Sequence, residues 1–183
     1  YDNLIAAGSM IGSGGMVVMD ETSCMVSIAK FYLEFTCEES CGKCSPCRIG
    51  NKRMLEILDK ITKGQGTMED LETLKNLAGV IKDTALCGLG QTSPNPILST
   101  INNFWDEYVE HVKDKKCRAG ACKSLMQYVI DPEQCVGCTS CARNCPVNAI
   151  QGEKKSPHHI NQDTCIKCGT CIEKCKFNAI SIK

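Results

Sequence analysis

The sequence predicts an α+β protein, in which a bundle of helices precedes a smaller unit of short helices and strands that is rich in cysteine. Three observations lead to this prediction. Four stretches between residues 21 and 112 repeat apolar residues at the spacing of an amphipathic helix. Farther along, a segment that begins at Cys135 recurs at Cys165 with its cysteines in the same positions. Finally, 16 of the 183 residues are cysteine, and most of them are spaced as C-x-x-C.

The overall composition excludes several classes of protein. The 21 basic residues balance 21 acidic residues, so the chain lacks the basic excess of a nucleic-acid-binding protein or a polybasic membrane anchor. No apolar run approaches the roughly 20 residues of a membrane-spanning helix, and the first residues do not resemble a secretory signal. Without such a signal, C-x-x-C spacing favours metal binding over disulfides. We therefore expect a cytoplasmic protein in a reducing compartment, with no membrane span and no nucleic-acid partner.

Residues 1–20, YDNLIAAGSMIGSGGMVVMD, place glycines around two short apolar runs, a pattern that predicts turns and one or two strands. The sequence begins at Tyr1 in the middle of this pattern, so we expect a longer polypeptide to precede it. A dinucleotide-binding fingerprint is rejected, because Val17 stands where a third glycine must follow Gly12 and Gly14.

Four amphipathic helices are expected next. Thr22 or Ser23 would cap the first helix. Thr67 and Asp70 resemble the capping box of the third, and Pro96 precedes the fourth. The apolar positions are Met25, Ile28, Ala29, Tyr32 and Phe35 in the first helix, Met54, Leu55, Leu58 and Ile61 in the second, Leu71, Leu74, Ala78 and Ile81 in the third, and Ile97, Ile101, Phe104, Trp105 and Tyr108 in the fourth. Faces of this kind predict the core of a helical bundle.

A first group of cysteines precedes the second helix, in the segment ESCGKCSPCRIG. Cys41, Cys44 and Cys47 stand at two-residue intervals and need a fourth ligand to hold a 4Fe-4S cluster. Outside the repeat, the candidates are Cys24, Cys37, Cys87, Cys117 and Cys122. Cys87 fits best, because it lies in a loop between the third and fourth helices where flanking glycines let the backbone approach a cluster. A partly occupied zinc or redox motif would leave the third cysteine of the segment unexplained.

The repeat carries a second spacing. CVGCTSCARNCPVNAI from Cys135 and CIKCGTCIEKCKFNAI from Cys165 both follow the C-x2-C-x2-C-x3-C pattern of bacterial ferredoxins, in which the fourth cysteine ligates the other cluster. We therefore predict two 4Fe-4S clusters, one held by Cys135, Cys138, Cys141 and Cys175 and the other by Cys165, Cys168, Cys171 and Cys145. A pair of zinc sites is the alternative, but zinc uses two separated C-x-x-C pairs rather than a third thiol nearby.

Each half of the repeat is expected to form a turn that carries three cysteines, a short helix that leads to the fourth, and a strand at 149–150 or 179–182. Pro146 follows the fourth cysteine of the first half, as in the ferredoxin pattern. Lys176 takes that place in the second half, a departure that affects the end of the helix more than the ligands.

A charged, glycine-containing linker between the two parts is predicted to offer no apolar core. Here His111, Cys117 and Cys122 follow an H-x5-C-x4-C spacing that suits a zinc site, with Cys24 as the preferred fourth ligand. Cys37, a partner subunit or water are the other candidates for that position. Alternatively, His111 merely complements the dipole at a helix C-terminus, and the two linker cysteines are free thiols.

The segments ESCGKCSPCRIG and LCGLGQTSPNPILST together resemble the C-terminal helical domain of the NADH-binding flavoprotein subunit shared by respiratory complex I and multimeric hydrogenases. With the two-cluster unit appended, the chain is similar to the flavoprotein (beta) subunit of electron-bifurcating, NAD(P)-linked iron-iron hydrogenases. The resemblance implies four parts. Residues 1–20 would end a truncated ubiquitin-like (SLBB) domain, 21–112 would form the helical-bundle 4Fe-4S domain, 113–130 a linker with the possible zinc site, and 131–183 the 2x(4Fe-4S) ferredoxin-like domain.

The function implied by this resemblance is intramolecular electron transfer through three 4Fe-4S clusters, between a flavin and NAD(H) site and partner redox subunits. FMN and NAD(H) would bind N-terminal to this sequence, so no catalytic residue is expected here. The implied partners are an iron-iron hydrogenase catalytic subunit and a small 2Fe-2S thioredoxin-like subunit in a hetero-oligomer, with ferredoxin as an external partner. The alternatives are the flavoprotein subunit of a non-bifurcating NADP-reducing hydrogenase or of a soluble formate dehydrogenase, and, from another class, a zinc-stabilised interaction module.

Overall fold

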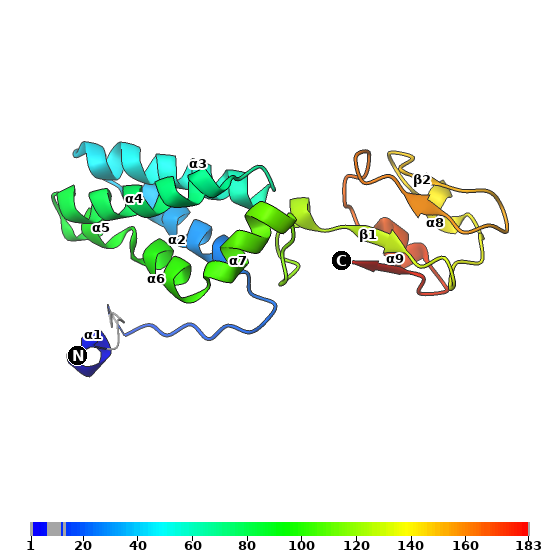
Figure 1. The fold of residues 1–183 in the computed structure, drawn as a ribbon, viewed down its shortest axis with the longest axis horizontal. Coiled ribbons are helices and arrows are strands. Elements are labelled where there is room, and N and C mark those ends of the chain that lie inside the picture. The colour runs from blue at the N-terminus through cyan, green and yellow to red at the C-terminus, as the bar shows by residue number, and fades with distance from the viewer. Residues whose placement is uncertain (1, 7–11, 13, 183) are drawn as a thin grey trace.

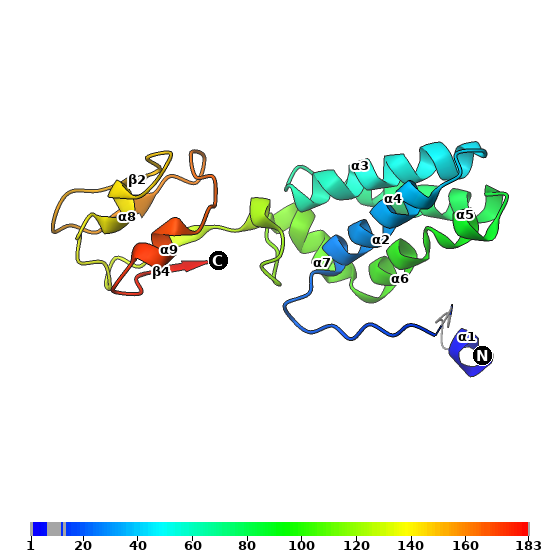
Figure 2. The same ribbon diagram turned by 180° about the vertical axis from the view of Figure 1, so that it is seen from behind.

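The structure consists of two lobes that follow one another along its longest axis and are joined by an extended segment (Figure 1). This computed structural model describes residues 2–6, 12 and 14–182. The first lobe is helical, and the second contains short helices and two-stranded sheets. The view from behind shows the same segment as the visible connection between the lobes (Figure 2). Among the described residues, no helix is long and apolar enough to cross a membrane.

The helical lobe buries one apolar core between its helices. Its elements are α2 (Met25–Glu39), η1 (Pro46–Gly50), α3 (Asn51–Thr62), α4 (Met68–Thr84), α5 (Gly88–Thr92), α6 (Asn95–Asn103), α7 (Trp105–Val109) and η2 (Glu110–Asp114). Helix α3 buries Met54, Leu58 and Ile61, and α4 buries all four of its predicted apolar positions, so both predicted faces point into the core. Thr67 and Asp70 form the predicted capping box, in which each side chain binds the backbone N–H of the other residue.

Helix α2 begins later and is rotated relative to the prediction. Neither Thr22 nor Ser23 caps it; Cys24 is the N-cap, and its sulfur accepts a hydrogen bond from Ser27 N at 3.5 Å. The buried positions are Met25, Val26, Ala29, Leu33 and Thr36. The predicted Phe35 is 56% exposed instead. Cys24 is only 1% exposed. Because its side chain lies in the core at the start of the helix, the buried face of α2 differs from the predicted face.

The predicted fourth helix is broken into two. Phe104, with φ −134° and ψ 39°, ends α6 and precedes α7, and it is 41% exposed rather than buried. After the break, the Tyr108 hydroxyl lies 2.8 Å from Thr100 Oγ1 in the core. The buried Glu107 accepts a hydrogen bond from Met25 N at 3.1 Å. The change of direction therefore places a carboxylate over the N-terminus of α2, where its charge complements the helix dipole.

The first residues do not form the predicted strands within the described part of the chain. Residues Asp2–Ala6 form the short helix α1, and 15–20 have no regular structure. A strand needs a neighbouring strand to pair with its backbone groups. The first lobe offers none in the described residues, because its elements there are all helical. Part of the predicted segment, at positions 7–11 and 13, lies outside the described residues.

The second lobe repeats one unit twice. Its elements are β1 (Tyr128–Ile130), α8 (Ser140–Arg143), β2 (Ile150–Gln151), β3 (His159–Ile160), α9 (Thr170–Lys174) and β4 (Ile180–Ile182). Strand β1 pairs antiparallel with β4, so the start of the first unit is joined to the end of the second. Strand β2 likewise pairs antiparallel with β3. The expected succession of cysteine turn, short helix and strand is present in both units, although the strands begin one residue after the predicted positions.

The repeated Asn-Ala-Ile sequence has a backbone explanation. Asn148 and Asn178 both adopt the left-handed conformation, with φ values of 53° and 51°. Asparagine tolerates this conformation better than most residues with a side chain. The turn lets the chain reverse after the fourth cysteine and enter the following strand.

The linker is packed against the helical lobe, contrary to the expectation that it lacks apolar contacts. Cys117, Cys122 and Leu125 belong to the core of the bundle. Leu125 lies in a short turn, η3 (Lys123–Leu125), that packs against Gly64: a Cβ atom added there would lie 2.7 Å from its side chain. The extended connection between the lobes therefore begins only after Leu125.

Candidate metal centres

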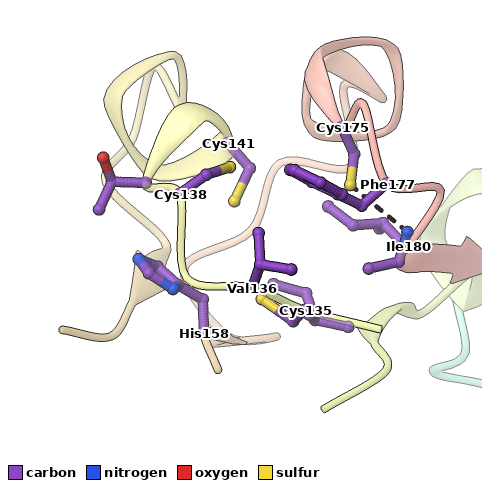
Figure 3. A pocket seen from close by; sticks show the side chains of 11 residues that line it. Cys135, Val136, Cys138, Cys141, His158, Cys175, Phe177 and Ile180 are labelled. Atoms are coloured by element: carbon purple, nitrogen blue, oxygen red, sulfur yellow. Dashed lines mark hydrogen bonds between the residues drawn. The ribbon is translucent and has the colours of Figure 1, made fainter. Parts of the chain in front are cut away.

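The first cavity of the second lobe is lined by Cys135, Cys138, Cys141 and Cys175 (Figure 3). Three of these cysteines come from the first unit, and Cys175 comes from the end of α9 in the second. Val136, Phe177 and Ile180 cover the same space with apolar side chains (Figure 3). Four thiols around an apolar space are the donor set that a 4Fe-4S cluster requires, so these residues fit that group.

The second cavity is related to the first by the repeat. It is lined by Cys165, Cys168, Cys171 and Cys145, so the fourth cysteine again comes from the other unit. Both cavities are partly open to solvent and are of similar size. The structure thus brings together the same two sets of cysteines that the ferredoxin spacing predicts.

Backbone N–H groups point at several of these sulfurs. Ala149 N donates to Cys145 Sγ at 3.3 Å, and Ala179 N donates to Cys175 Sγ at 3.4 Å. In the second unit, Lys167 N donates to Cys165 Sγ at 3.4 Å. Such bonds stabilise a thiolate, the form that binds iron. Burial has the opposite effect and raises the pKa of Cys171 to about 11, so the metal has to displace a proton there.

A third group of cysteines lies at one end of the helical lobe. We call Cys41, Cys44, Cys47 and Cys87 the bundle site. Cys47 is buried in η1, a short π-helical turn that leads into α3, whereas Cys41 and Cys87 are exposed. A hydrogen bond with the Leu86 backbone is the main cause of a lowered pKa at the Cys44 thiol.

Gly90 brings the Cys87 segment against Cys47. A Cβ atom at this position would lie 2.7 Å from Ala85 Cβ and 3.3 Å from Cys47 Cβ, so only glycine lets α5 pack this closely. Around Gly88, by contrast, no atom of the described residues lies within 4 Å of an added Cβ. Of the two glycines that follow Cys87, Gly90 is thus required for packing, whereas Gly88 is not.

Two polar side chains lie within hydrogen-bond distance of Cys47 Sγ. Ser40 Oγ lies 3.2 Å from this sulfur, and Asn51 Nδ2 lies 3.5 Å from it. Ser93 Oγ donates to Asn51 Oδ1 at 2.9 Å. Asn51 is fully buried and Ser93 nearly so.

The fourth candidate centre joins the linker to the helical lobe, and we call it the linker site. Cys24, His111, Cys117 and Cys122 are all buried, and their ligand atoms lie within 4.8 Å of one another. Cys24 Sγ lies 3.8 Å from Cys122 Sγ. His111 Nε2 lies 3.3 Å from Cys24 Sγ and 3.4 Å from Cys122 Sγ. In a tetrahedral zinc site, Zn–S and Zn–N bond lengths imply separations of roughly 3.7 Å between two sulfurs and roughly 3.5 Å between sulfur and nitrogen.

The orientation of His111 suits metal binding as well. Its Nδ1 donates to the carbonyl oxygen of Glu107 at 2.7 Å. This bond leaves the lone pair of Nε2 directed at the sulfurs, the arrangement found in most metal-binding histidines. His111 therefore does more than complement a helix dipole.

Contacts within the linker site shift the pKa values of Cys24, His111 and Cys122. The hydrogen bond with Cys122 lowers the pKa of the Cys24 thiol, and the hydrogen bond with Cys24, followed by burial, raises the pKa of Cys122. Burial alone would lower the pKa of His111, but its hydrogen bond with Cys24 raises it overall. Buried thiolates need a compensating charge, which a bound dication would supply.

Sequence reasoning missed one residue of the first cavity. His158 is 4% exposed and lines this cavity, and its Nε2 has no hydrogen-bond partner among the described residues. Tyr128 lines the second cavity in the equivalent way. Both residues stand seven positions before the first cysteine of a unit, so an alignment of the two units extended toward the N-terminus would have identified them.

Comparisons with known proteins agree with this division. Residues 27–111 match the NADH-ubiquinone oxidoreductase-F iron-sulfur binding region, and 128–182 match the 4Fe-4S dicluster domain. The NADP-reducing hydrogenase subunit HndC of Solidesulfovibrio fructosivorans is 63% identical over 158 residues, which cover 86% of this chain and 32% of that protein. An NADH-quinone oxidoreductase subunit of Streptomyces coelicolor is 39% identical over 124 residues, 68% of this chain and 28% of that protein. The chain thus spans about a third of the length of these relatives.

A solved structure shows a similar arrangement over half of the chain. It is an NAD+-reducing [NiFe]-hydrogenase in the H2-reduced state, 30% identical, with a TM-score of 0.51 over 52% of this chain and 16% of that chain. Together these matches confirm the predicted resemblance to the NADH-binding subunit of complex I and to NAD(P)-linked hydrogenase subunits.

Proposed function

We propose that this chain carries electrons through three 4Fe-4S clusters. The proposal is supported by the match of residues 27–111 to the NADH-ubiquinone oxidoreductase-F iron-sulfur binding region and of 128–182 to the 4Fe-4S dicluster domain. The observation that carries the proposal is the sharing of cysteines between the two units, since each cavity takes three from one unit and the fourth from the other. Zinc has no need of such an exchange, whereas two-cluster ferredoxins depend on it.

The chain's own residues hold, shield and tune these centres. The bundle site would bind one cluster, and the two cavities of the repeat would bind the others. A cluster of this kind supplies one-electron transfer, with a potential set by hydrogen bonds, charge and exposure. Val136, Phe177 and Ile180 limit access of water to the first cavity, and the backbone N–H groups of Ala149 and Ala179 stabilise thiolates.

The larger assembly extends the proposal beyond this chain. The hydrogenase relative is named as NADP-reducing, which favours a hydrogenase over a soluble formate dehydrogenase. We place the FMN and NAD(H) site N-terminal to this sequence. The proposed partners are an iron-iron hydrogenase catalytic subunit and a 2Fe-2S thioredoxin-like subunit, with ferredoxin as an external carrier, in a cytoplasmic bifurcating complex. The parts 1–20, 21–112, 113–130 and 131–183 remain the proposed domains.

A second proposal concerns the linker site, where we assign zinc to Cys24, His111, Cys117 and Cys122. Its support is the agreement between the measured separations and tetrahedral geometry, together with the free lone pair on His111. Zinc has no redox chemistry, so it would hold the linker on α2 without accepting electrons. The attachment would act as a pivot, because the extended segment that follows Leu125 leads directly to the second lobe (Figure 1).

Metal analysis tests both proposals at once. The full chain, reconstituted without oxygen, should contain about twelve iron and twelve sulfide and about one zinc. Several equivalents of zinc with only traces of iron would instead establish the rival, a zinc-stabilised interaction module. With FMN added, the chain alone should not oxidise NADH, because residues 1–20 fail the dinucleotide-binding fingerprint.

The partners need a separate experiment. Co-purification of the native complex, followed by identification of its subunits, distinguishes the three redox alternatives. Two results together would support bifurcation: an iron-iron hydrogenase catalytic subunit in the complex, and reduction of ferredoxin at the same time as NAD(P) during hydrogen oxidation. A complex with formate dehydrogenase subunits would refute the hydrogenase assignment while leaving electron transfer intact.

A further inference from the structure

Cys47 differs from the other cysteines of the bundle site in its surroundings. It is 5% exposed, whereas Cys41 and Cys87 are exposed to solvent. A sulfur that is shielded from water depends on protein groups for its hydrogen bonds. Ser40 and Asn51 provide those groups, at 3.2 Å and 3.5 Å from Cys47 Sγ.

The direction of both bonds is fixed by chemistry. A cysteine that ligates iron is a thiolate, which accepts hydrogen bonds and donates none. The Ser40 hydroxyl must therefore donate to Cys47 Sγ. A thiolate can accept only from the NH2 group of Asn51, so Nδ2 faces Cys47. The Asn51 Oδ1 then faces Ser93 Oγ at 2.9 Å and shares the serine proton with the Gly90 carbonyl oxygen, also at 2.9 Å.

Local structure explains why Asn51 reaches this sulfur. Asn51 follows Cys47 by four residues at the start of α3, and helical side chains lean toward the preceding turn. Burying an amide is unfavourable unless its polar atoms are paired. Asn51 is 0% exposed, and its amide contacts only Cys47 and Ser93 among the side-chain hydrogen bonds of the described residues. A fully buried amide held between a ligand sulfur and a serine points to a role at the cluster.

We propose that Asn51 and Ser40 raise the reduction potential of the cluster at the bundle site by donating hydrogen bonds to Cys47 Sγ, and that Ser93 orients Asn51 for this task. The inference rests on the proposed function, since it requires Cys47 to be a ligand. Reduction adds negative charge to the cluster and its thiolates. Donors near one of these sulfurs stabilise the reduced form more than the oxidised form.

The test is a potentiometric titration of the full chain followed by electron paramagnetic resonance (EPR). The signal of the bundle site is identified as the one that disappears in Cys47→Ser. In Ser40→Ala and Asn51→Leu, this signal should titrate at a more negative potential. At the wild-type midpoint, the ratio of reduced to oxidised cluster should fall roughly three- to tenfold, because the hydrogen bond stabilises both redox states and only the difference between them moves the potential. Ser93→Ala should give a smaller shift in the same direction.

Matched variants separate tuning from structural damage. Ser45→Ala changes an exposed serine in the same segment whose side chain makes no capping bond, and it should leave the potential unchanged. Ser40→Thr keeps the hydroxyl and should restore the wild-type potential. Iron content and melting temperature identify any variant that has lost the cluster or the fold. If Asn51→Leu loses the cluster or the fold, the potentials of Ser40→Ala and Ser93→Ala test the proposal instead.

Two failures can be told apart. If Cys47→Ser keeps all three cluster signals, Cys47 is no ligand and the proposed bundle site is wrong. If Cys47→Ser loses one signal but Ser40→Ala and Ser93→Ala titrate like Ser45→Ala, the bundle site stands and the tuning role is overturned. A shift toward positive potential in Ser40→Ala would also overturn it.

Discussion

The linker site makes a sharp prediction for Cys24→Ser. Cys24 has two roles in the structure, as the N-cap of α2 and as a member of the linker site. Serine is one of the preferred N-cap residues, so it keeps the cap. It is a much poorer zinc ligand than cysteine. The substitution therefore removes the metal contact while preserving the start of the helix.

The expected magnitude follows from binding linkage. Free zinc at 100 times its dissociation constant stabilises a protein by about 2.7 kcal/mol. For a domain of 60–100 residues, each kcal/mol shifts the melting temperature by about 4–8 °C. Chelation of zinc should thus lower the melting temperature of the helical lobe by roughly 10–20 °C in the wild-type chain. Cys24→Ser protein should already melt near the lower value, and chelator should change it little.

The assay combines circular dichroism melting, with and without chelator, and zinc analysis. Cys37→Ser is the control, because Cys37 also lies on α2 but outside the linker site. It should keep about one zinc and the full response to chelator. The reasoning is refuted if Cys24→Ser retains one equivalent of zinc, or if both variants respond to chelator like the wild type.

Three further predictions concern the clusters. Cys87→Ser should lower iron from about twelve to about eight per chain and remove one EPR signal; an unchanged spectrum would mean that another cysteine completes the bundle site. Cys145→Ser should lose the same signal as Cys165→Ser, because both line the second cavity; loss of the other ferredoxin-type signal would show that each unit uses only its own cysteines. Gly90→Ala should destabilise the helical lobe by about 1–3 kcal/mol through overpacking, whereas Gly88→Ala, with open space around it, should not; equal effects would contradict the packing role.

Features that depend on nearby residues could be predicted from the sequence. Thr67 and Asp70 of the capping box are only three positions apart, and the observed hydrogen bonds agree with the prediction. The cysteines of the repeat line the two cavities in the groups that the spacing predicts. There the spacing is constrained by the size of a cluster, and duplication shows the pattern twice.

Features that depend on distant neighbours could not be predicted. Cys24 is the cap of α2 because His111 and Cys122, which lie far along the chain, contact its sulfur in the core. The break at Phe104 is set by the burial of Tyr108 and Glu107 rather than by a helix-breaking residue. The burial of Asn51 could not be predicted from apolar periodicity, because asparagine is polar. Its amide is instead paired with Cys47 and Ser93, which only the folded structure brings together.

The proposed exchange of cysteine ligands between the two units would also limit when the clusters can be completed during synthesis. The first cavity needs Cys175, which follows Cys135 by 40 residues, and the second needs Cys165, Cys168 and Cys171 in addition to Cys145. A ribosome makes roughly 5–20 residues per second, so the first three cysteines of the repeat wait for seconds without their partner. During that interval they are exposed thiols, open to zinc and to oxidation. Delivery of iron and sulfide is therefore best timed after both units have emerged, and a chain stalled between them would be the species most readily filled with the wrong metal.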